Sequence, residues 1–225
     1  MNYQSVAIDG PSGAGKSTLA RRLAEALGFL YVDTGAIYRT VGLSTFRQGI
    51  DCADPGEIAT MLKQISIDLR YGQDGLQHMY LNGEDVTEEI RRNEISKYAS
   101  VVSAIPAVRS FLLDMQRQLA AMHHVVMDGR DIGTVVLPNA DVKVFLTATA
   151  EARAARRWKE LEERGNPTGF ASVLSDLNER DLNDSSRAAA PLKQAEDAIL
   201  VDTTGYTLGE SFHVLLDLIR ERLSK

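Results

Sequence analysis

The segment from Gly10 to Thr18 constrains this chain more than any other part of its sequence. Up to Ser17 it fits the pattern G-x-x-x-x-G-K-[ST], a phosphate-binding loop. The apolar run Ser5–Ile8 before it predicts a buried strand, and the apolar spacing after it predicts a helix that ends at Gly28. In this order of elements, successive backbone N–H groups point at an anion and the helix N-terminus adds its positive dipole end. The sequence therefore predicts a site for nucleotide phosphates.

Two side chains of this loop have a defined chemical role. Lys16 would reach the β- and γ-phosphates of ATP, and the Ser17 hydroxyl would coordinate Mg²⁺, with Asp33 or Asp128 assisting through a water molecule. The predicted ATP-binding residues are Gly10, Pro11, Ser12, Gly13, Ala14, Gly15, Lys16, Ser17 and Thr18.

Composition and charge argue against several classes of protein. The 225 residues carry a net charge of −6, so there is no overall basic footprint for nucleic acid. The single cysteine, Cys52, has no partner for an internal disulfide or a multi-cysteine zinc site, which favours a reducing compartment. The chain begins without a signal pattern, and no apolar run is long enough to span a bilayer. We therefore expect a cytoplasmic protein with no membrane or nucleic-acid partner.

A second strand, Phe29–Val32, is expected to close a right-handed βαβ unit. The segment Asp33–Arg39 follows its carboxyl end, where ligands bind in open α/β sheets. Thr34 is predicted to cap a helix that runs to about Gln48, which places Tyr38 and Arg39 near its start.

The pattern changes between residues 51 and 93. Alternating apolar residues at 65–70 and 79–81, with turns at 72–75 and 82–83, predict a small antiparallel insertion without a catalytic cluster.

Helical spacing returns at residues 94–104 and again from Pro106 to about Met122. The expected core face of the second helix is Val108, Leu112, Met115 and Leu119. The adjacent His123 and His124 lack a third metal ligand and are interpreted as a solvated pair.

A third buried strand, Val125–Asp128, ends in a carboxylate, as a Walker-B strand does. The loop Gly129–Thr134 leaves the same end of this strand, so we expect Arg130 and Asp131 at the ligand edge of the sheet.

The strand Val142–Leu146 precedes a helix, capped by Thr149, that is rich in cations. These cations are Arg153, Arg156, Arg157, Lys159 and Arg164. Pairs such as Arg156 with Glu160 and Lys159 with Glu163 would make it a solvated helix. The alternative, favoured because of the phosphate loop, is a lid whose arginines close over the transferring phosphates.

A helix over about 170–183, a fifth strand at 198–202 and a last helix complete the pattern. The last helix has a capping box, Thr207 with Glu210, and its expected core face is Phe212, Leu215, Leu216, Ile219 and Leu223. The predicted fold class is α/β: a five-stranded parallel sheet with helices on both faces and a small antiparallel β insertion. A single domain of 1–225 would comprise a core (about 1–33, 104–148 and 170–225), a monophosphate-binding region (about 34–103) and a lid (about 149–169).

Among phosphate-loop proteins, GTP-binding regulators need a D-x-x-G switch followed by N-K-x-D. The D-x-x-G at Asp202–Gly205 has no N-K-x-D after it, and no signature of a motor protein is visible. A small kinase remains.

At this point the chain resembles the bacterial-type cytidylate kinases, within the nucleoside monophosphate kinase family, over essentially its whole length. The residues that carry this resemblance are Asp9–Thr18, Asp33–Arg39, Asp128–Val136, Glu179–Asp181 with Asp184, and Arg187 through Leu192. The insertion at 51–93 is also similar to the monophosphate-side segment of these enzymes.

The resemblance implies transfer of the γ-phosphate of ATP to CMP or dCMP, giving ADP and CDP or dCDP, with Mg²⁺. It implies that Thr34, Arg39, Arg130 and Arg187 hold the acceptor phosphate. Ser100, Arg109 and Asp131 are implied as cytosine readers, Arg180 and Asp184 as ribose partners, and Tyr38 as a further CMP-binding residue. The expected catalytic residues are Lys16, Arg130, Arg187, Arg153 and Arg157. Serine also occurs at the position of Thr34 in the family, and threonine keeps the hydroxyl.

The chemistry of these side chains agrees with that assignment. Asp131 can accept a hydrogen bond from the cytosine amino group, whereas uracil would place a carbonyl against the carboxylate, at a cost of about 1–3 kcal/mol. No general base is needed, because the acceptor phosphate oxygen is already an anion; alignment and charge neutralisation remain for the protein to supply.

Two alternatives to this function stay open from the sequence. One is a kinase of another small acceptor, UMP or AMP. The other is a non-catalytic ATP-binding module, against which the intact set of Lys16 and arginines argues. The expected partners are the small molecules ATP and CMP or dCMP, and the expected oligomeric state is a monomer.

Overall fold

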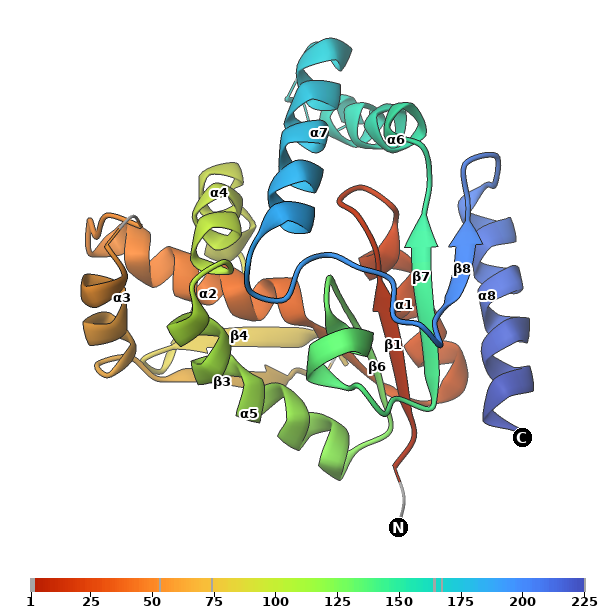
Figure 1. Ribbon diagram of the computed structural model, residues 1–225, viewed down its shortest axis with the longest axis horizontal. Helices are drawn as coiled ribbons and strands as arrows, with labels where there is room; N and C mark the ends of the chain where they lie inside the picture. The colour runs from red at the N-terminus through yellow and green to blue at the C-terminus, as the bar shows by residue number, and fades with distance from the viewer. Residues whose placement is uncertain (1–2, 53, 74, 164, 167, 225) are drawn as a thin grey trace. The chain divides into compact units, whose positions relative to one another are not determined.

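Apolar strands alternate with amphipathic helices along the chain, and in the computed structural model they form a parallel sheet with helices (Figure 1). The structure describes residues 3–52, 54–73, 75–163, 165–166 and 168–224. The strand order is β2-β6-β1-β7-β8. The predicted fold class, a five-stranded parallel sheet with a separate antiparallel insertion, is confirmed.

Strand β1 (Ser5–Asp9) lies at the centre of this sheet. It pairs in parallel with β6 (Val125–Gly129) and with β7 (Val142–Thr147), and β7 pairs in parallel with β8 (Ile199–Asp202). The edge strand β2 (Leu30–Asp33) lies next to β6. Val6, Ala7 and Ile8 are completely buried, which explains why β1 is a continuous apolar run rather than an alternating one.

The chain forms two compact units. Unit 1 consists of Met1–Tyr31 and Ala120–Lys225, and unit 2 of Val32–Leu119. The division of the chain into core, monophosphate-binding region and lid stays a prediction.

In unit 1, α1 (Lys16–Leu27) and α8 (Leu208–Leu223) pack together against the sheet (Figure 1). Their shared core includes Leu19, Leu23, Val144, Leu215 and Ile219. The predicted capping box is confirmed, because the Thr207 hydroxyl accepts from the Glu210 N–H and the Glu210 carboxylate accepts from the Thr207 N–H. The core face of α8 is as expected, with Phe212 and Leu223 partly buried.

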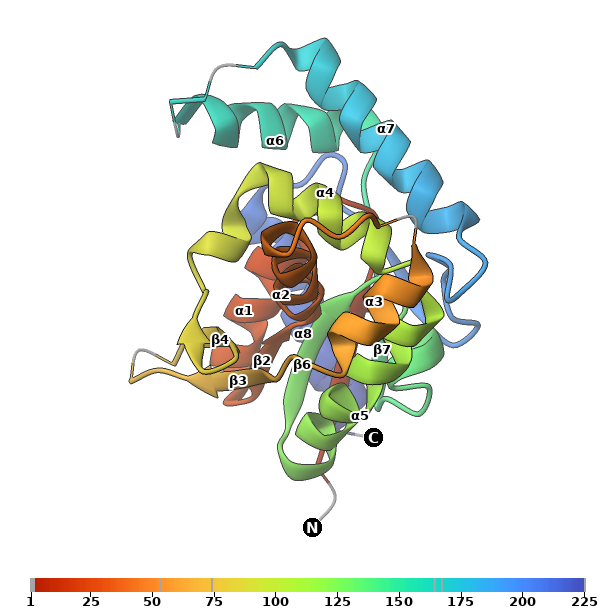
Figure 2. The same ribbon diagram turned by 90° about the vertical axis from the view of Figure 1, so that its left-hand side faces the viewer.

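Two helices of unit 1 follow the carboxyl end of β7 and pack on each other, α6 (Ala150–Glu163) and α7 (Phe170–Ser186) (Figure 2). They share a small apolar cluster of their own: Ala154, Leu161, Val173 and Leu177, with Trp158 and Leu174 against it. The Thr149 hydroxyl accepts from the Ala152 N–H, as its predicted capping role requires. Arg164, predicted in the cationic lid, lies outside the described residues, as does Pro167.

Unit 2 contains α2 (Thr34–Arg47), α3 (Pro55–Leu62), α4 (Asn93–Val102) and the short 3₁₀ helix η1 (Glu89–Arg91), together with α5 (Pro106–Met122) up to Leu119. The insertion is an antiparallel sheet of β3 (Ile67–Tyr71), β4 (Gln77–Leu81) and β5 (Glu84–Asp85), of which the short β5 was not predicted. Helices α2 and α4 lie against each other (Figure 2). A Cβ at Gly42 would lie 2.8 Å from the Ala99 backbone nitrogen, so only glycine allows this packing.

The predicted cap of α2 is wrong. Asp33, not Thr34, is the N-cap: its carboxylate accepts from the Ala36 N–H at 2.8 Å, and Thr34 is the first helical residue and buried. Both residue types favour caps, and the one that keeps an extended backbone at the strand end takes the role.

Two further expectations are only partly met. In α5, Val108 and Leu112 are buried, but Met115 and Leu119 are half-buried and Gln116 takes the next core position. His123 is exposed as expected, whereas the His124 ring is half-buried, accepts from the Gln4 N–H at 3.0 Å and packs 5.0 Å from the Phe29 ring.

Within the part of the chain that the structure describes, no helix is long and apolar enough to cross a membrane.

Candidate active site

The phosphate loop connects β1 to α1, and its glycines adopt backbone conformations that residues with a side chain rarely adopt. Gly10 has φ +150°, and a Cβ there would lie 2.0 Å from the Leu146 carbonyl oxygen of β7. Gly15, with φ +86°, stands at the N-cap of α1 without a side-chain cap. The first N–H groups of α1 therefore have no side-chain acceptor from this position, which suits them to a phosphate.

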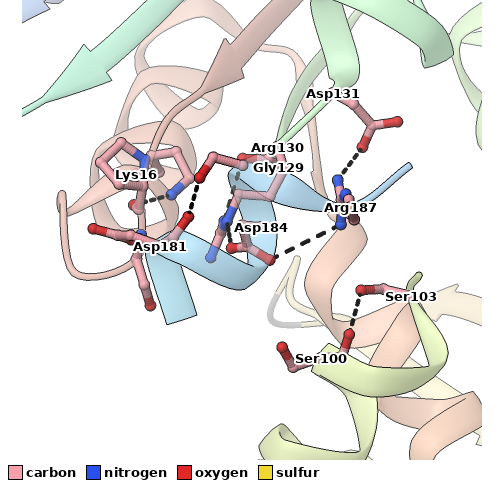
Figure 3. Close-up of polar contacts among 12 residues, drawn as sticks. Lys16, Ser100, Ser103, Gly129, Arg130, Asp131, Asp181, Asp184 and Arg187 are labelled. Carbon is pink, nitrogen blue, oxygen red and sulfur yellow. Dashed lines mark hydrogen bonds and ion pairs between the residues drawn. The ribbon is translucent and has the colours of Figure 1, made fainter. Parts of the chain in front are cut away.

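Lys16 folds back over this loop. Its Nζ donates to the Pro11 carbonyl oxygen at 2.7 Å, and its side chain is buried (Figure 3). Burial, and then the nearby Arg130 guanidinium, lowers the pKa of Lys16 to about 7, although Asp128 and Asp184 act in the opposite direction. An ammonium group whose charge is disfavoured to this extent gains strongly from an incoming anion.

The oxygens suited to Mg²⁺ are those of Ser17 and Asp128. The Ser17 hydroxyl donates to one carboxylate oxygen of Asp128 at 2.9 Å, and the Tyr31 hydroxyl donates to the other at 2.9 Å. Among the described residues no group of three or more His, Cys, Asp or Glu side chains could hold a metal ion. The oxygens of Ser17 and Asp128 nevertheless fit Mg²⁺, because proteins hold this ion through one or two oxygens plus substrate phosphates. Asp33 instead caps α2 and pairs with Arg39 at 2.8 Å.

Unit 1 also contains a largely buried cluster of arginines and carboxylates on the loop that follows β6, on α7 and at the residue directly after α7. Arg130 donates to Asp184 at 2.7 Å, and Arg187 lies 3.9 Å from Asp184 and 3.5 Å from Asp131 (Figure 3). Burial alone would raise the pKa of Asp184, but Arg130, Arg180 and Arg187 lower it below its usual value. In Figure 3, Asp184 lies between the two guanidinium groups of Arg130 and Arg187.

The cations of α6 do not act alike. Arg153 is buried, with its guanidinium donating to the carbonyls of Ser12 and Ala148, both at 2.9 Å, and lying 2.6 Å from Asp181. Asp181 in turn accepts from the Ser12 N–H at 3.3 Å. Arg153 and Asp181 thus bind the carbonyl and the N–H of Ser12, respectively, and hold the phosphate loop at this residue.

The other two arginines of α6 have different partners. Arg156 donates to the Thr203 carbonyl and hydroxyl oxygens, and Arg157 pairs with Glu160 at 3.1 Å on the exposed face. The sequence-based pair of Arg156 with Glu160 is therefore replaced by Arg157 with Glu160.

In unit 2, the predicted CMP-binding residues lie on α2, α4 and α5. The Arg109 guanidinium carbon is 5.7 Å from the centre of the Tyr38 ring, and its Nη1 donates to the Ser103 carbonyl at 3.2 Å. The Ser103 hydroxyl donates to the Ser100 carbonyl at 2.8 Å (Figure 3). Ser103 therefore connects the two predicted base readers of this unit, Ser100 and Arg109.

Arg39 is positioned by the same turn that starts α2. A Cβ at Gly35 would lie 3.1 Å from both Arg39 Nη1 and Asp33 Oδ1, so glycine leaves room for this ion pair. The Gln77 side chain of β4 bonds both the N–H and the carbonyl of Asp33, which ties the insertion to this turn.

Sequence reasoning gave no role to Asp9, Asp181 or Ser103. Asp9 precedes the phosphate loop, is buried, and accepts from the N–H groups of Ile132 and Gly133 at 2.8 and 2.7 Å. A carboxylate at the end of a buried strand is a signal that could have singled it out.

The sequence and the fold of this chain are similar to those of known proteins. The family model described as cytidylate kinase matches residues 6–221. A cytidylate kinase of Caldicellulosiruptor bescii is 49% identical over 218 residues, which are 97% of this chain and 96% of that protein. One of Desulfitobacterium hafniense is 47% identical over 97% of this chain and 93% of its own length. An uncharacterized protein from Eubacterium ventriosum has a similar fold, with a TM-score of 0.54 and 12% identity over 97% of this chain and 98% of its own.

Proposed function

This chain belongs to the cytidylate kinase family, and from that premise we propose how its two units divide the transfer of the γ-phosphate of ATP to CMP or dCMP. The donor phosphates bind at the glycine loop of unit 1. The observation that carries this proposal is the burial of Lys16 over a glycine loop, in the unit that also contains the ion-paired Arg130 and Arg187, whose side chains are 19% and 6% exposed.

On the donor side, residues Gly10–Thr18 surround the β- and γ-phosphates of ATP with backbone N–H groups and Lys16. Ser17 would hold the Mg²⁺, with Asp128, whose carboxylate lies 2.9 Å from the Ser17 hydroxyl, assisting through a water molecule. The metal supplies charge neutralisation for the phosphate oxygens. Lys16 exchanges its bond to the Pro11 carbonyl for a phosphate oxygen, which keeps its ammonium charged.

On the acceptor side, Thr34, Arg39, Arg130 and Arg187 bind the phosphate of CMP. The cluster in unit 1 supports this role, since Arg130, Arg180 and Arg187 lie close enough together for all three to lower the pKa of Asp184. Guanidinium groups gathered in this way suit a phosphate dianion. Arg180 and Asp184 bind the ribose.

The base is read by Asp131, Arg109 and Ser100, with Tyr38 beside Arg109. Asp131 accepts from the cytosine amino group, and Arg109 donates to the O2 and N3 edge. Uracil presents the reverse polarity at the first of these contacts, which lowers its affinity by about 1–3 kcal/mol.

Transfer itself requires alignment rather than proton abstraction, because the attacking phosphate oxygen is already charged. Arg153 holds the phosphate loop by donating to the Ser12 carbonyl oxygen. Arg157, which pairs with Glu160 on the exposed face of α6, is the lid arginine that can exchange this partner for a phosphate. A closed lid excludes water and so limits hydrolysis of ATP.

We infer further that the protein acts as a monomer in the cytoplasm on small molecules. The net charge of −6 supports the absence of a nucleic-acid partner.

The test is ADP formation from ATP and Mg²⁺ with CMP, dCMP, UMP, AMP or GMP in parallel reactions. We expect turnover of CMP and dCMP well above that of the other acceptors. Turnover centred on UMP or AMP would contradict the roles of Asp131 and Arg109, and no turnover with any acceptor would indicate an ATP-binding module instead.

A further inference from the structure

Asp9 is the last residue of β1 and the residue directly before Gly10 of the phosphate loop. Its side chain binds the turn that follows β6. One carboxylate oxygen accepts from the Ile132 N–H at 2.8 Å and the other from the Gly133 N–H at 2.7 Å. Asp9 is only 5% exposed, so these bonds are made without competition from water.

The turn that Asp9 binds is a single turn of π-helix, η2 (Ile132–Val136), and Asp131 stands at its N-cap without a side-chain cap of its own. The first N–H groups of a helical turn have no acceptor within the turn. Asp9 supplies that acceptor from another strand. A carboxylate there is also favoured by the positive end of the turn's dipole.

The packing around Gly133 of this turn is close. A Cβ at Gly133 would lie 3.1 Å from the Lys143 side chain and 3.4 Å from an Asp9 carboxylate oxygen. Lys143 is itself fixed, since its Nζ donates to the Pro138 carbonyl and to both oxygens of Asp197. The turn therefore packs at Gly133 against a buried carboxylate and a buried lysine stem.

Arg130 and Asp131 immediately precede this turn. Arg130 pairs with Asp184 and Asp131 with Arg187. Any shift of the N–H groups of Ile132 and Gly133 would carry these two side chains with it, because they lie within three residues along the chain.

We propose that Asp9 is a positioning residue for the acceptor, which fixes Arg130 and Asp131 relative to the start of the phosphate loop by binding the turn Ile132–Val136. This proposal rests on the proposed function, since it assumes that Arg130 and Asp131 bind CMP. In this proposal Asp9 does not contact the substrate and acts only by holding the turn Ile132–Val136.

The test compares Asp9→Asn with Asp141→Asn. Asparagine keeps the shape of Asp9 but places an amide donor against one of the two N–H groups. Asp141 is a matched control at the opposite end of β1, where its carboxylate accepts from the Ser5 N–H and hydroxyl. Steady-state kinetics with CMP and UMP are measured for both variants and the unaltered protein, with binding of a non-hydrolysable ATP analogue measured separately.

For Asp9→Asn we expect kcat/KM for CMP to fall about 10- to 100-fold, with a higher KM for CMP and a smaller CMP-over-UMP preference, because displacing a reacting group by about 1 Å has effects of this size. Affinity for the ATP analogue should stay within about twofold, and Asp141→Asn should leave all these constants unchanged. Gly133→Ala, which disturbs the same turn but leaves Asp9 in place, should reproduce the pattern and serves if Asp9→Asn does not fold.

Unchanged CMP kinetics in Asp9→Asn and Gly133→Ala would overturn the proposal. So would a loss of ATP-analogue affinity equal to the loss for CMP, since that would show a general effect on the loop. Failure of the proposed function is distinguishable, because the unaltered protein would then not turn over CMP at all.

Discussion

The ion pairs of the arginine–carboxylate cluster in unit 1 are less exposed to water than those of unit 2. In that cluster, Arg130 and Asp184 have side chains 19% and 7% exposed, and Arg187 and Asp131 are each 6% exposed. In unit 2, the side chains of the Arg39–Asp33 pair are 24% and 23% exposed. Arg47, which binds Glu84 and Glu89, is 33% exposed. Because charges interact more strongly where water is excluded, we expect each ion pair of the cluster to contribute more than each pair of unit 2.

Lys16→Ala removes the most strongly desolvated cation of unit 1, and we expect the largest effect from it. kcat should fall by at least about 1,000-fold, because both a phosphate contact and a buried positive charge are lost. Folding should be preserved, because burial, which lowers the pKa of Lys16 to about 7, means that its positive charge does not stabilise the folded protein. The measurements are ADP formation and thermal unfolding. Activity within tenfold of the unaltered protein would contradict the role of this loop.

Matched Arg→Met substitutions at Arg130 and Arg39 test the comparison of the two units directly. Arg130→Met should reduce the free energy of unfolding by about 3 kcal/mol, because Asp184 loses its closest partner in a buried site. Arg39→Met, whose pair is reached by water, should cost about 1 kcal/mol or less. Urea unfolding at neutral pH measures both. Equal costs would remove the distinction between the two units.

The pH dependence of stability tests the charge of Asp9 in unit 1. Burial raises the pKa of Asp9 from 3.8 to about 6, with a further increase from Asp131, against the opposing effects of the Gly133 and Ile132 N–H groups and of Lys16. The folded protein therefore binds this proton more tightly than the unfolded chain. The free energy of unfolding should fall as pH rises from about 4 to about 6, by about 3 kcal/mol for this group alone.

Asp9→Asn provides the reference for that measurement, because asparagine does not titrate. The stability of the variant relative to the unaltered protein should increase over the same pH interval and level off above about pH 7. Parallel stability curves for the two proteins would show that the Asp9 carboxylate is not destabilised by its burial.

Asp131→Ala tests base reading from unit 1. The ratio of kcat/KM for CMP to that for UMP should fall about 10- to 100-fold, the equivalent of one lost donor–acceptor match. Affinity for ATP should change far less. Asp131→Asn sharpens the test, since its amide can donate to the uracil carbonyl and should favour UMP. An unchanged ratio in both variants would mean that the base is read elsewhere.

Local patterns predicted the parts of this site that lie within one segment. The glycine loop, the carboxylate at the end of β6 and the Arg130–Asp131 pair each follow from residues that are neighbours in the sequence. The contacts of Asp9 with Ile132 and Gly133 join residues 123 and 124 positions apart, and Arg153 reaches Ser12 over 141 positions. No periodicity or cap rule links such partners, because only the completed sheet brings them together.

The same limit explains the misplaced cap of α2. Asp33 and Thr34 are both favoured at N-caps, and the choice depends on which residue leaves the strand with extended backbone. For α8 the start was marked without such ambiguity, by the capping box of Thr207 with Glu210.

Ser103→Ala should have the smallest effect and probes how firmly unit 2 holds its base readers. The hydroxyl lost is the donor to the Ser100 carbonyl, while the Ser103 carbonyl that accepts from Arg109 remains. The free energy of unfolding should fall by about 1 kcal/mol, and KM for CMP should rise severalfold with kcat unchanged. Thr60→Ala is the matched control, because Thr60 also donates its hydroxyl to a carbonyl one turn earlier, on α3. If KM for CMP rises in Ser103→Ala alone, the readers of unit 2 depend on hydroxyl-to-backbone contacts where those of unit 1 depend on buried charge. If it rises in neither, the position of Arg109 is set by the Tyr38 ring and the remaining backbone contact, and hydrogen bonding through Ser103 contributes to stability alone.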